Sequence, residues 1–398
     1  MPRVALLDGL RGYFLVFMMV THLFGGRYAL VKVNHAELGF VQDAQGFVFL
    51  SGLLVGALYG RRMDRQGFAG PARQIWWRSF ELYLWTIGLM VLMLVLRGVL
   101  PGAEIVWKEW LGLLPTGAPP VMAAATTLLY QPTFFDILPQ YILYMAAAPP
   151  LLWLCVTGRA MTVLVGSVIP WFTMQLGMHL ALADGVNALL SSWYPGLTLR
   201  AAFNPFAWQI LFFCAMALGA LWTQGKVDVG RILDPRQPGP AIVAAIVVAI
   251  FALWRFGFTF ELVPRVMALR FWIFENRTEF SLVFLVNFVA LGYLIAWVLV
   301  AGREAGSKAV RTASAILNGL FMLPFLRLLG RHSLHVYAWH VLLVYLVLWF
   351  DFRYGPFNSF ERSLMGLACI PLLALPAVLG EWRKQRRDRR ATLAAPAE

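Results

Sequence analysis

The feature that most constrains this chain is a succession of long apolar runs. About ten stretches have the length and apolar character that a helix needs to cross ~30 Å of hydrocarbon. They cover residues 9–26, 39–60, 75–97, 137–157, 161–181, 206–223, 240–257, 280–301, 333–350 and 363–380. Lipid offers backbone groups no hydrogen-bond partners, so runs of this length indicate helices. We therefore predict an all-α, polytopic transmembrane helix bundle of about ten spans, or about 11–12 with short or re-entrant helices.

The charged residues predict the orientation of these spans in the membrane. Only 13% of the residues are charged, against about 25% in ordinary soluble domains, which excludes a soluble protein. Basic residues follow every second run, which predicts cytoplasmic N- and C-termini and explains the net charge of +13 without a nucleic-acid partner. These residues are Arg61, Arg62, Arg65, Arg73, Arg159, Lys226, Arg231, Arg236, Arg303, Lys308, Arg311 and the tail from Arg383 to Arg390.

We expect one transmembrane domain, residues 1–382, and a basic cytoplasmic tail, residues 383–398, that contacts anionic lipid. No cleavable signal peptide is visible, because the first apolar run is long enough to span and lacks a small-residue cleavage site. Three cysteines lie inside apolar runs at irregular spacing, which predicts packing residues and neither disulfides nor a metal site. They are Cys155, Cys214 and Cys369.

One face of the first span is polar. Arg11 and His22 are eleven positions apart, about three helical turns plus roughly 20 degrees, so their side chains point the same way. Asp8 lies one turn before Arg11 and shares this face. Ionisable groups inside a bilayer are costly, so this face is expected to line a protein interior or a wet cavity. The alternative is an interfacial ion pair of Asp8 with Arg11 and a histidine bonded to a neighbouring helix.

Depth in the membrane brings two further side chains to the level of His22. At ~1.5 Å of rise per residue, His22 and His340 lie roughly 16 and 13 Å from the cytoplasmic ends of their spans. Ser51 enters from the outside and reaches a similar level. The three side chains predict a reaction chamber near the bilayer midplane, although chance placement of single His and Ser residues would look the same.

A second polar group lies at the predicted outer ends of several spans. Carboxylates and amides beside a tryptophan suit a sugar, whose hydroxyls need polar partners and whose ring packs on aromatics. The alternative is helix capping by Asp136 and Asn204 with an aromatic belt at Trp208. Asp43 is expected well inside its span, which favours function. The group comprises Asp43, Gln45, Asp136, Gln140, Asn204, Trp208 and Gln209.

Two outer segments accompany this group. Residues 101–136 contain an apolar part, 121–130, that is too short to cross and is expected to be re-entrant or a lid. Residues 255–279 interleave charges with aromatic residues, which predicts an amphipathic helix on the outer surface. On the cytoplasmic side, residues 313–330 are expected to form an interfacial helix or a short eleventh crossing.

A third polar group faces the cytoplasm. Cationic and hydroxyl groups at the start of a span form a natural phosphate site, which suits an activated acyl donor made in the cell. The group comprises Arg327, Arg331, His332 and Ser333, with Arg11 assisting the donor. The excess of basic residues that membrane proteins carry on their cytoplasmic side explains Arg327 and Arg331 equally well. The spacing of His332, His335 and His340 does not place three imidazoles on one helical face, so no metal is expected.

These groups permit two classes of function. In an acyltransferase, His22 acts as general base on an acceptor hydroxyl, Asp43 orients its imidazole or stabilises the charged form, and Ser51 or His340 bonds the oxyanion or places the acceptor. An acyl-histidine intermediate stays open as an alternative to direct transfer. In a proton-coupled transporter, Asp8, Arg11, His22 and Asp43 form a proton relay. A transporter predicts an internal repeat and discontinuous helices in matching positions of its two halves, and neither is visible in the sequence.

Several motifs resemble one family along nearly the whole chain. The spacing Arg11-x10-His22 resembles the acyltransferase-3 superfamily, and Gly39-Phe40 with the stretch Asp43 to Ser51-Gly52 resembles its OpgC-type branch. Three later stretches strengthen the resemblance: Asp136 to Tyr141, Phe203 to Gln209, and Gly330 to Tyr345. Two positions depart from the family pattern. Thr21 stands where an amide side chain is expected, and Gln45 stands where an acidic residue is frequent.

This resemblance implies a succinyltransferase of the bacterial inner membrane. Its donor is expected to be succinyl-CoA, used as a co-substrate with no bound cofactor, and its acceptor an osmoregulated periplasmic glucan. An O-acetyltransferase of another cell-surface polysaccharide is the alternative within the enzyme class. Membrane lipid is the other expected partner, and a homodimer stays open.

Overall fold

The computed structural model describes residues 5–264, 266–267, 271 and 274–394, with side chains up to residue 386. The predicted all-α fold is confirmed: in this part of the chain the only β interaction is an isolated bridge between Tyr130 and Arg200. Nine of the described helices are long and apolar enough to cross a membrane, and two bent helix pairs bring the number to as many as 11. The chain forms two compact units, a terminal unit of residues 1–34 and 315–398 and an internal unit of residues 35–314.

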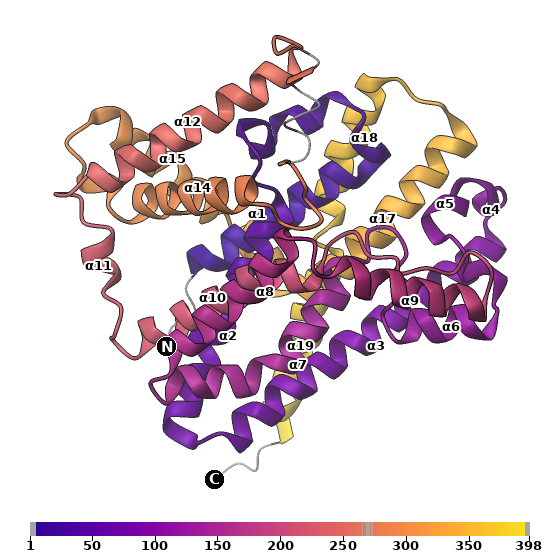
Figure 1. Ribbon diagram of the computed structural model, residues 1–398, viewed down its shortest axis with the longest axis horizontal. Coiled ribbons are helices and arrows are strands. Elements are labelled where there is room, and N and C mark those ends of the chain that lie inside the picture. The colour runs from indigo at the N-terminus through magenta and orange to yellow at the C-terminus, as the bar shows by residue number, and fades with distance from the viewer. Residues whose placement is uncertain (1–4, 265, 268–270, 272–273, 395–398) are drawn as a thin grey trace. The chain divides into compact units, whose positions relative to one another are not determined.

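The terminal unit contains the first candidate span, the last two, Ser333–Tyr354 and Ser359–Arg386, and the part of the bent helix pair that follows Ala315 (Figure 1). Polar side chains bind its spans together: Arg362 forms a 2.9 Å ion pair with Asp351, and the Trp339 indole donates to the Leu372 carbonyl at 2.9 Å. The helices are α1 (Ala5–His22), the end of α15 (Lys308–Phe321), α16 (Pro324–Arg331), α17 (Ser333–Tyr354), α18 (Ser359–Leu372) and α19 (Leu375–Ala394).

Glycines allow α1 to approach the chain around α16 at backbone distance. A Cβ atom on Gly9 would lie 1.6 Å from the Phe321 carbonyl oxygen, and one on Gly12 would lie 1.9 Å from the Leu326 carbonyl oxygen. A Cβ atom on Gly330 would lie 1.8 Å from the Asp8 carbonyl oxygen. The close packing at Gly9 and Gly12 fixes the rotation of α1, which decides where its polar face points.

The internal unit is built around α2 and α10, which run in the same direction. Cβ atoms on Gly52 and Gly56 of α2 would lie 2.1 and 1.9 Å from the carbonyl oxygens of Phe212 and Met216 on α10. The main helices are α2 (Asp43–Gln66), α3 (Ala69–Val99), α7 (Ile137–Val156), α8 (Ala160–Gln175), α9 (Leu180–Trp193), α10 (Pro205–Thr223), α12 (Gly239–Thr259) and α14 (Leu282–Val300). The short helices are α4 (Ala103–Val106), α5 (Lys108–Leu111), α6 (Pro119–Thr126) and α11 (Val229–Ile232).

Two helix ends differ from their predicted positions, and both carry predicted site residues. The first α-helix ends at His22, because Phe24, Gly25 and Gly26 adopt left-handed φ angles of 53°, 64° and 74°. The α2 helix begins at Asp43, so the expectation that Asp43 lies well inside its span is wrong. Residues 39–42 form a loop there, and the Phe40 amide donates to Asn287 Oδ1 at 2.7 Å.

The structure also has two breaks that the sequence did not indicate. The α8 and α9 helices are bent by 72° at their junction, and α15 and α16 by 55°. Neither bend was predicted from the sequence. Residues 101–136 form only short helices, which agrees with the prediction that their apolar part, 121–130, is too short to cross. The surface helix expected over 255–279 lies partly outside the described residues.

Candidate functional site

The two histidines predicted to share one depth lie side by side. His22, the last residue of α1, places its Nδ1 atom 3.3 Å from Nε2 of His340 on α17. The ring centroids are 5.5 Å apart with planes inclined by 31°. His340 is fully buried, whereas His22 is half-buried. The structure therefore pairs the proposed base with a second imidazole. From the sequence we had predicted only that the two imidazoles lie at the same depth.

The opposite end of the polar face of α1 also bonds to α17. Arg11 Nη2 donates to Ser333 Oγ at 2.6 Å, and Ser333 is the first residue of α17. Asp8 is buried on the same helix. Arg11 and His22 thus contact Ser333 and His340 on one neighbouring helix, as the shared face of α1 predicted.

A carboxylate that the sequence analysis missed holds two of the predicted donor-binding residues. Glu381 on α19 accepts from His332 Nε2 at 3.1 Å, and its Oε1 lies 3.5 Å from Nη1 of Arg331. Arg327 lies half-buried on α16, one turn before Arg331. The one signal in the sequence is that Glu381 is an acidic residue directly before the strongly basic tail.

The predicted catalytic residues Asp43 and Ser51 belong to the internal unit. Asp43 Oδ1 lies 3.7 Å from His35 Nδ1. Burial lowers the pKa of His35 to about 4, so His35 is neutral near pH 7 and this contact is not an ion pair. Ser51 on α2 is buried, and its hydroxyl has no hydrogen-bond partner among the described residues.

The predicted acceptor-binding residues are also in the internal unit, and most of them bond to backbone. Gln45 is fully buried and closes a capping box with Gln42 at the start of α2. Gln140 donates to the Phe203 carbonyl at 3.1 Å, and Gln209 donates to the Ser167 carbonyl at 2.6 Å. The Trp208 indole is buried and donates to the Arg277 carbonyl at 3.1 Å. These bonds fasten α7 and α10 to neighbouring loops and helices.

The two predicted helix caps differ. Asn204 caps α10, because its Oδ1 accepts from the Phe206 amide at 2.9 Å. Asp136 does not cap α7: it has helical dihedral angles and no side-chain bond to the start of that helix, so this expectation is wrong. Burial raises the pKa of Asp136 to about 6, although the positive charge of Arg277 opposes the shift.

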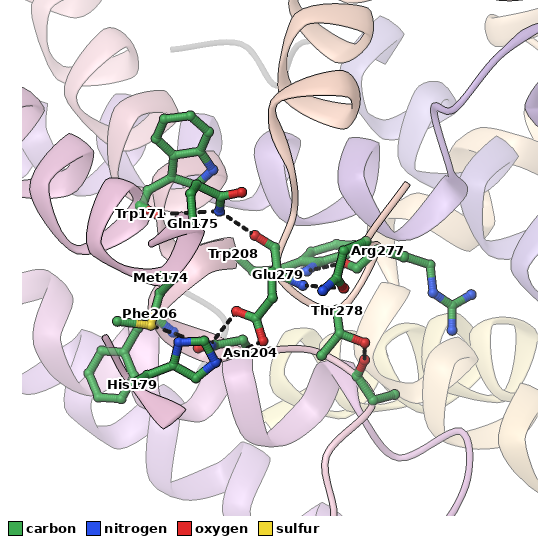
Figure 2. Close-up of polar contacts among 12 residues, drawn as sticks. Trp171, Met174, Gln175, His179, Asn204, Phe206, Trp208, Arg277, Thr278 and Glu279 are labelled. Atoms are coloured by element: carbon green, nitrogen blue, oxygen red, sulfur yellow. Dashed lines mark hydrogen bonds and ion pairs between the residues drawn. The ribbon is translucent and has the colours of Figure 1, made fainter. Parts of the chain in front are cut away.

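Asn204 also belongs to a polar network centred on Glu279 (Figure 2). The two oxygens of Glu279 contact His179 Nε2 at 3.1 Å and Asn204 Nδ2 at 2.7 Å. The Gln175 amide donates to the Glu279 carbonyl at 2.7 Å. The network ties the segment before α14 to the break between α8 and α9 and to the start of α10.

Among the residues that the structure describes, no group of three or more His, Cys, Asp or Glu side chains is placed to hold a metal ion. Cys155 and Cys369 are buried and Cys214 is half-buried, and all three are free thiols.

The comparison with protein families gives a match over nearly the whole chain. The family model described as OpgC protein matches residues 3–385. No curated protein and no solved structure matches this chain.

Proposed function

The chain belongs to the OpgC protein family, which indicates a multi-pass membrane acyltransferase, and we propose that it moves a succinyl group from cytoplasmic succinyl-CoA to hydroxyls of periplasmic glucans. We place it in the bacterial inner membrane with both termini in the cytoplasm. The contact between His22 and His340 carries the proposal of a histidine base. Burying two imidazoles between transmembrane helices costs free energy, which makes a functional role the default hypothesis.

In the proposed reaction His22 acts as general base. It takes the proton of an acceptor hydroxyl, whose oxygen attacks the thioester carbonyl of the donor. The carbon–sulfur bond then breaks, and the departing thiolate takes the proton back from the imidazolium. An imidazole suits this cycle because its ordinary pKa of about 6.5 lets it take and release a proton near neutrality. Carbonyl groups at the C-terminal end of α1 favour the transient positive charge.

The start of α17 is the proposed site for the anionic part of the donor. Arg11 and Ser333 already form a bond there, and Arg331 and His332 flank it along the chain. Cations and hydroxyl groups beside a helix N-terminus suit phosphate groups. Glu381 opposes anion binding, because it pairs with both Arg331 and His332 and would compete with the phosphates. An anionic donor therefore has to displace this carboxylate from the two cations.

A proton-coupled transporter is the second candidate. The two bent helix pairs favour it, because discontinuous helices in a membrane protein often surround a transport site. Membership of the OpgC family favours the acyltransferase. Glucan analysis and transport assays on the same pair of strains separate the two candidates.

The test is mass spectrometry of periplasmic glucans from cells with and without the gene. The proposal predicts succinyl esters on the glucans of cells that carry the gene, their loss on deletion, and their return on complementation. An acetyl ester in their place would leave the enzyme class intact and replace the acyl group. Unchanged glucans in the deletion strain would contradict the proposal, and a transport defect in that strain would favour the transporter.

A further inference from the structure

The backbone of α17 fixes the position of the proton on His340. The Nδ1 atom of His340 lies 2.5 Å from the carbonyl oxygen of Tyr337, one turn earlier. A carbonyl oxygen can only accept, so Nδ1 must carry the hydrogen. In a neutral imidazole the other nitrogen, Nε2, then holds the lone pair. The ring is fully buried and also contacts the Tyr337 side chain edge-on, with centroids 4.6 Å apart.

This arrangement determines which nitrogen of His22 carries its hydrogen. His22 Nδ1 faces Nε2 of His340 at 3.3 Å, and two nitrogens in contact need one hydrogen between them. Because Nε2 of His340 holds a lone pair, His22 Nδ1 must be the donor. The opposite tautomer of His340 would place lone pairs of Nδ1 and of the Tyr337 oxygen against each other at 2.5 Å, which is repulsive. Neutral His22 therefore holds its lone pair on Nε2.

We propose that His340 is a positioning residue that holds His22 in the Nδ1–H tautomer, so that Nε2 of His22 is the atom that takes the acceptor proton. The inference rests on the proposed function and names the reacting atom within it. It replaces the expectation that His340 bonds the oxyanion or the acceptor. Both nitrogens of His340 already have partners, Tyr337 on one side and His22 on the other.

The proton balance needs no transfer to His340. The O–H bond of the acceptor breaks, and an N–H bond forms at Nε2 of His22. The imidazolium keeps its Nδ1–H bond to His340, which becomes stronger because the donor is now charged. Nε2 then returns the proton to the departing thiolate. An aspartate has the same orienting role in hydrolase triads, and here a neutral imidazole fixed by a backbone carbonyl takes that role.

The test compares His340→Gln with His340→Leu in the full-length protein. The oxygen of a glutamine amide can accept from His22 Nδ1, whereas leucine fills similar volume and cannot accept. We expect His340→Gln to keep kcat within about tenfold of wild type and His340→Leu to lower it by roughly 10²- to 10⁴-fold, with an unchanged KM for the acyl-CoA donor in both. Equal losses of kcat in the two variants, with native donor KM, would overturn the inference.

Measuring the tautomer of His22 in the wild-type protein tests the inference even if a His340 variant does not fold. The chain contains six histidines. In ¹⁵N spectra of histidine-labelled wild-type protein, the signals lost on His22→Asn substitution belong to His22. We expect a protonated Nδ1 and an unprotonated Nε2 for this residue, and a mixture of tautomers in His340→Leu. An unprotonated Nδ1 in the wild type would refute the inference.

The result that would overturn this inference differs from the result that would overturn the proposed function. An inactive His22→Asn variant beside a fully active His340→Leu variant would overturn the role of His340 and leave the general base in place. A His22→Asn variant that still acylates glucan would overturn the proposed function, whatever the tautomer.

Discussion

The terminal and internal units use their buried polar side chains differently. In the terminal unit the predicted site residues bond to other side chains: His22 to His340, Arg11 to Ser333, and His332 to Glu381. In the internal unit the predicted acceptor-binding residues bond mainly to backbone carbonyls, as Gln140 and Gln209 do.

The difference distinguishes groups that can do chemistry from groups that hold the fold. A bond between two ionisable side chains on separate helices costs free energy to bury, which makes it a candidate for a role in which protonation or charge is used. A bond from an amide to a backbone carbonyl satisfies an acceptor that a loop or a proline leaves open. Substitutions in the terminal unit should therefore change activity, and those in the internal unit should mainly change stability.

The largest expected effect is on folding, and it applies to the glycine contacts of both units. Gly12→Leu places a side chain where a Cβ atom would already lie 1.9 Å from the Leu326 carbonyl oxygen, and Gly56→Leu meets the Met216 oxygen at the same distance. Separating the backbones should cost at least ~1–3 kcal/mol and lower the yield of folded protein, measured by fluorescence size-exclusion chromatography. Gly88→Leu is the control, since nothing lies within 4 Å of its added Cβ atom. Equal yields for Gly12→Leu and Gly88→Leu would show that α1 does not pack this closely.

The next effect compares one polar bond from each unit. Arg11→Met removes the bond to Ser333 and should lower kcat/KM by about 10- to 100-fold while the protein stays folded. Gln209→Met removes the bond to the Ser167 carbonyl and should lower the free energy of unfolding by about 1 kcal/mol. Its activity per folded molecule should stay within about twofold of wild type. A raised KM for the glucan in Gln209→Met would instead support the predicted acceptor-binding role of this residue.

A smaller effect, with opposite signs in two variants, concerns the donor. Arg331→Gln should raise the KM for the acyl-CoA several-fold and leave kcat nearly unchanged, because it removes one cation from the proposed phosphate site. Glu381→Gln should lower the same KM, because the carboxylate no longer competes for Arg331 and His332. The exposed Arg303→Gln is the control. An unchanged donor KM in both variants would leave Arg331 as a topology signal only.

The last expected effect is a pH dependence of stability in the internal unit. The folded-state pKa of Asp136 is raised from 3.8 to about 6, so its stabilising contribution is full below pH 3.8 and is lost as the pH rises through about 6. The Tm of the wild-type protein should fall across this window relative to that of Asp136→Asn, by about 2–4 °C for each kcal/mol of the contribution. Thermal unfolding in detergent at several pH values measures the difference. Parallel Tm curves for the two proteins would show that the carboxyl group of Asp136 is not desolvated.

Much of the fold was predictable from the sequence, because the hydropathy of a segment indicates whether it lies in the bilayer and its charge indicates on which side it ends. The apolar runs located the spans, and helical periodicity placed Arg11 and His22 on one face. The left-handed turn at Phe24 was not predictable, because a non-glycine residue with positive φ has no reliable local signal. It ends α1 at His22 and so decides where this side chain lies.

The candidate site was predictable in part for the same reason. Depth along a span can be counted, and the count brought His22 and His340 to one level. The pairing of Glu381 with Arg331 and His332 depends on how α19 packs, which residue spacing does not reveal. The Glu279 network needs the break between α8 and α9, where nothing in the apolar pattern indicated a bend.

The central claim is that His22 is the general base of an acyl transfer, and the most direct measurement is transfer by the purified protein. Wild-type protein and His22→Ala, matched for folded yield, are given acyl-CoA and isolated glucan, and ester formation on the glucan is followed by mass spectrometry. The account predicts transfer by the wild type and a loss of at least about 10²-fold in His22→Ala. Transfer by His22→Ala at the wild-type rate would contradict it.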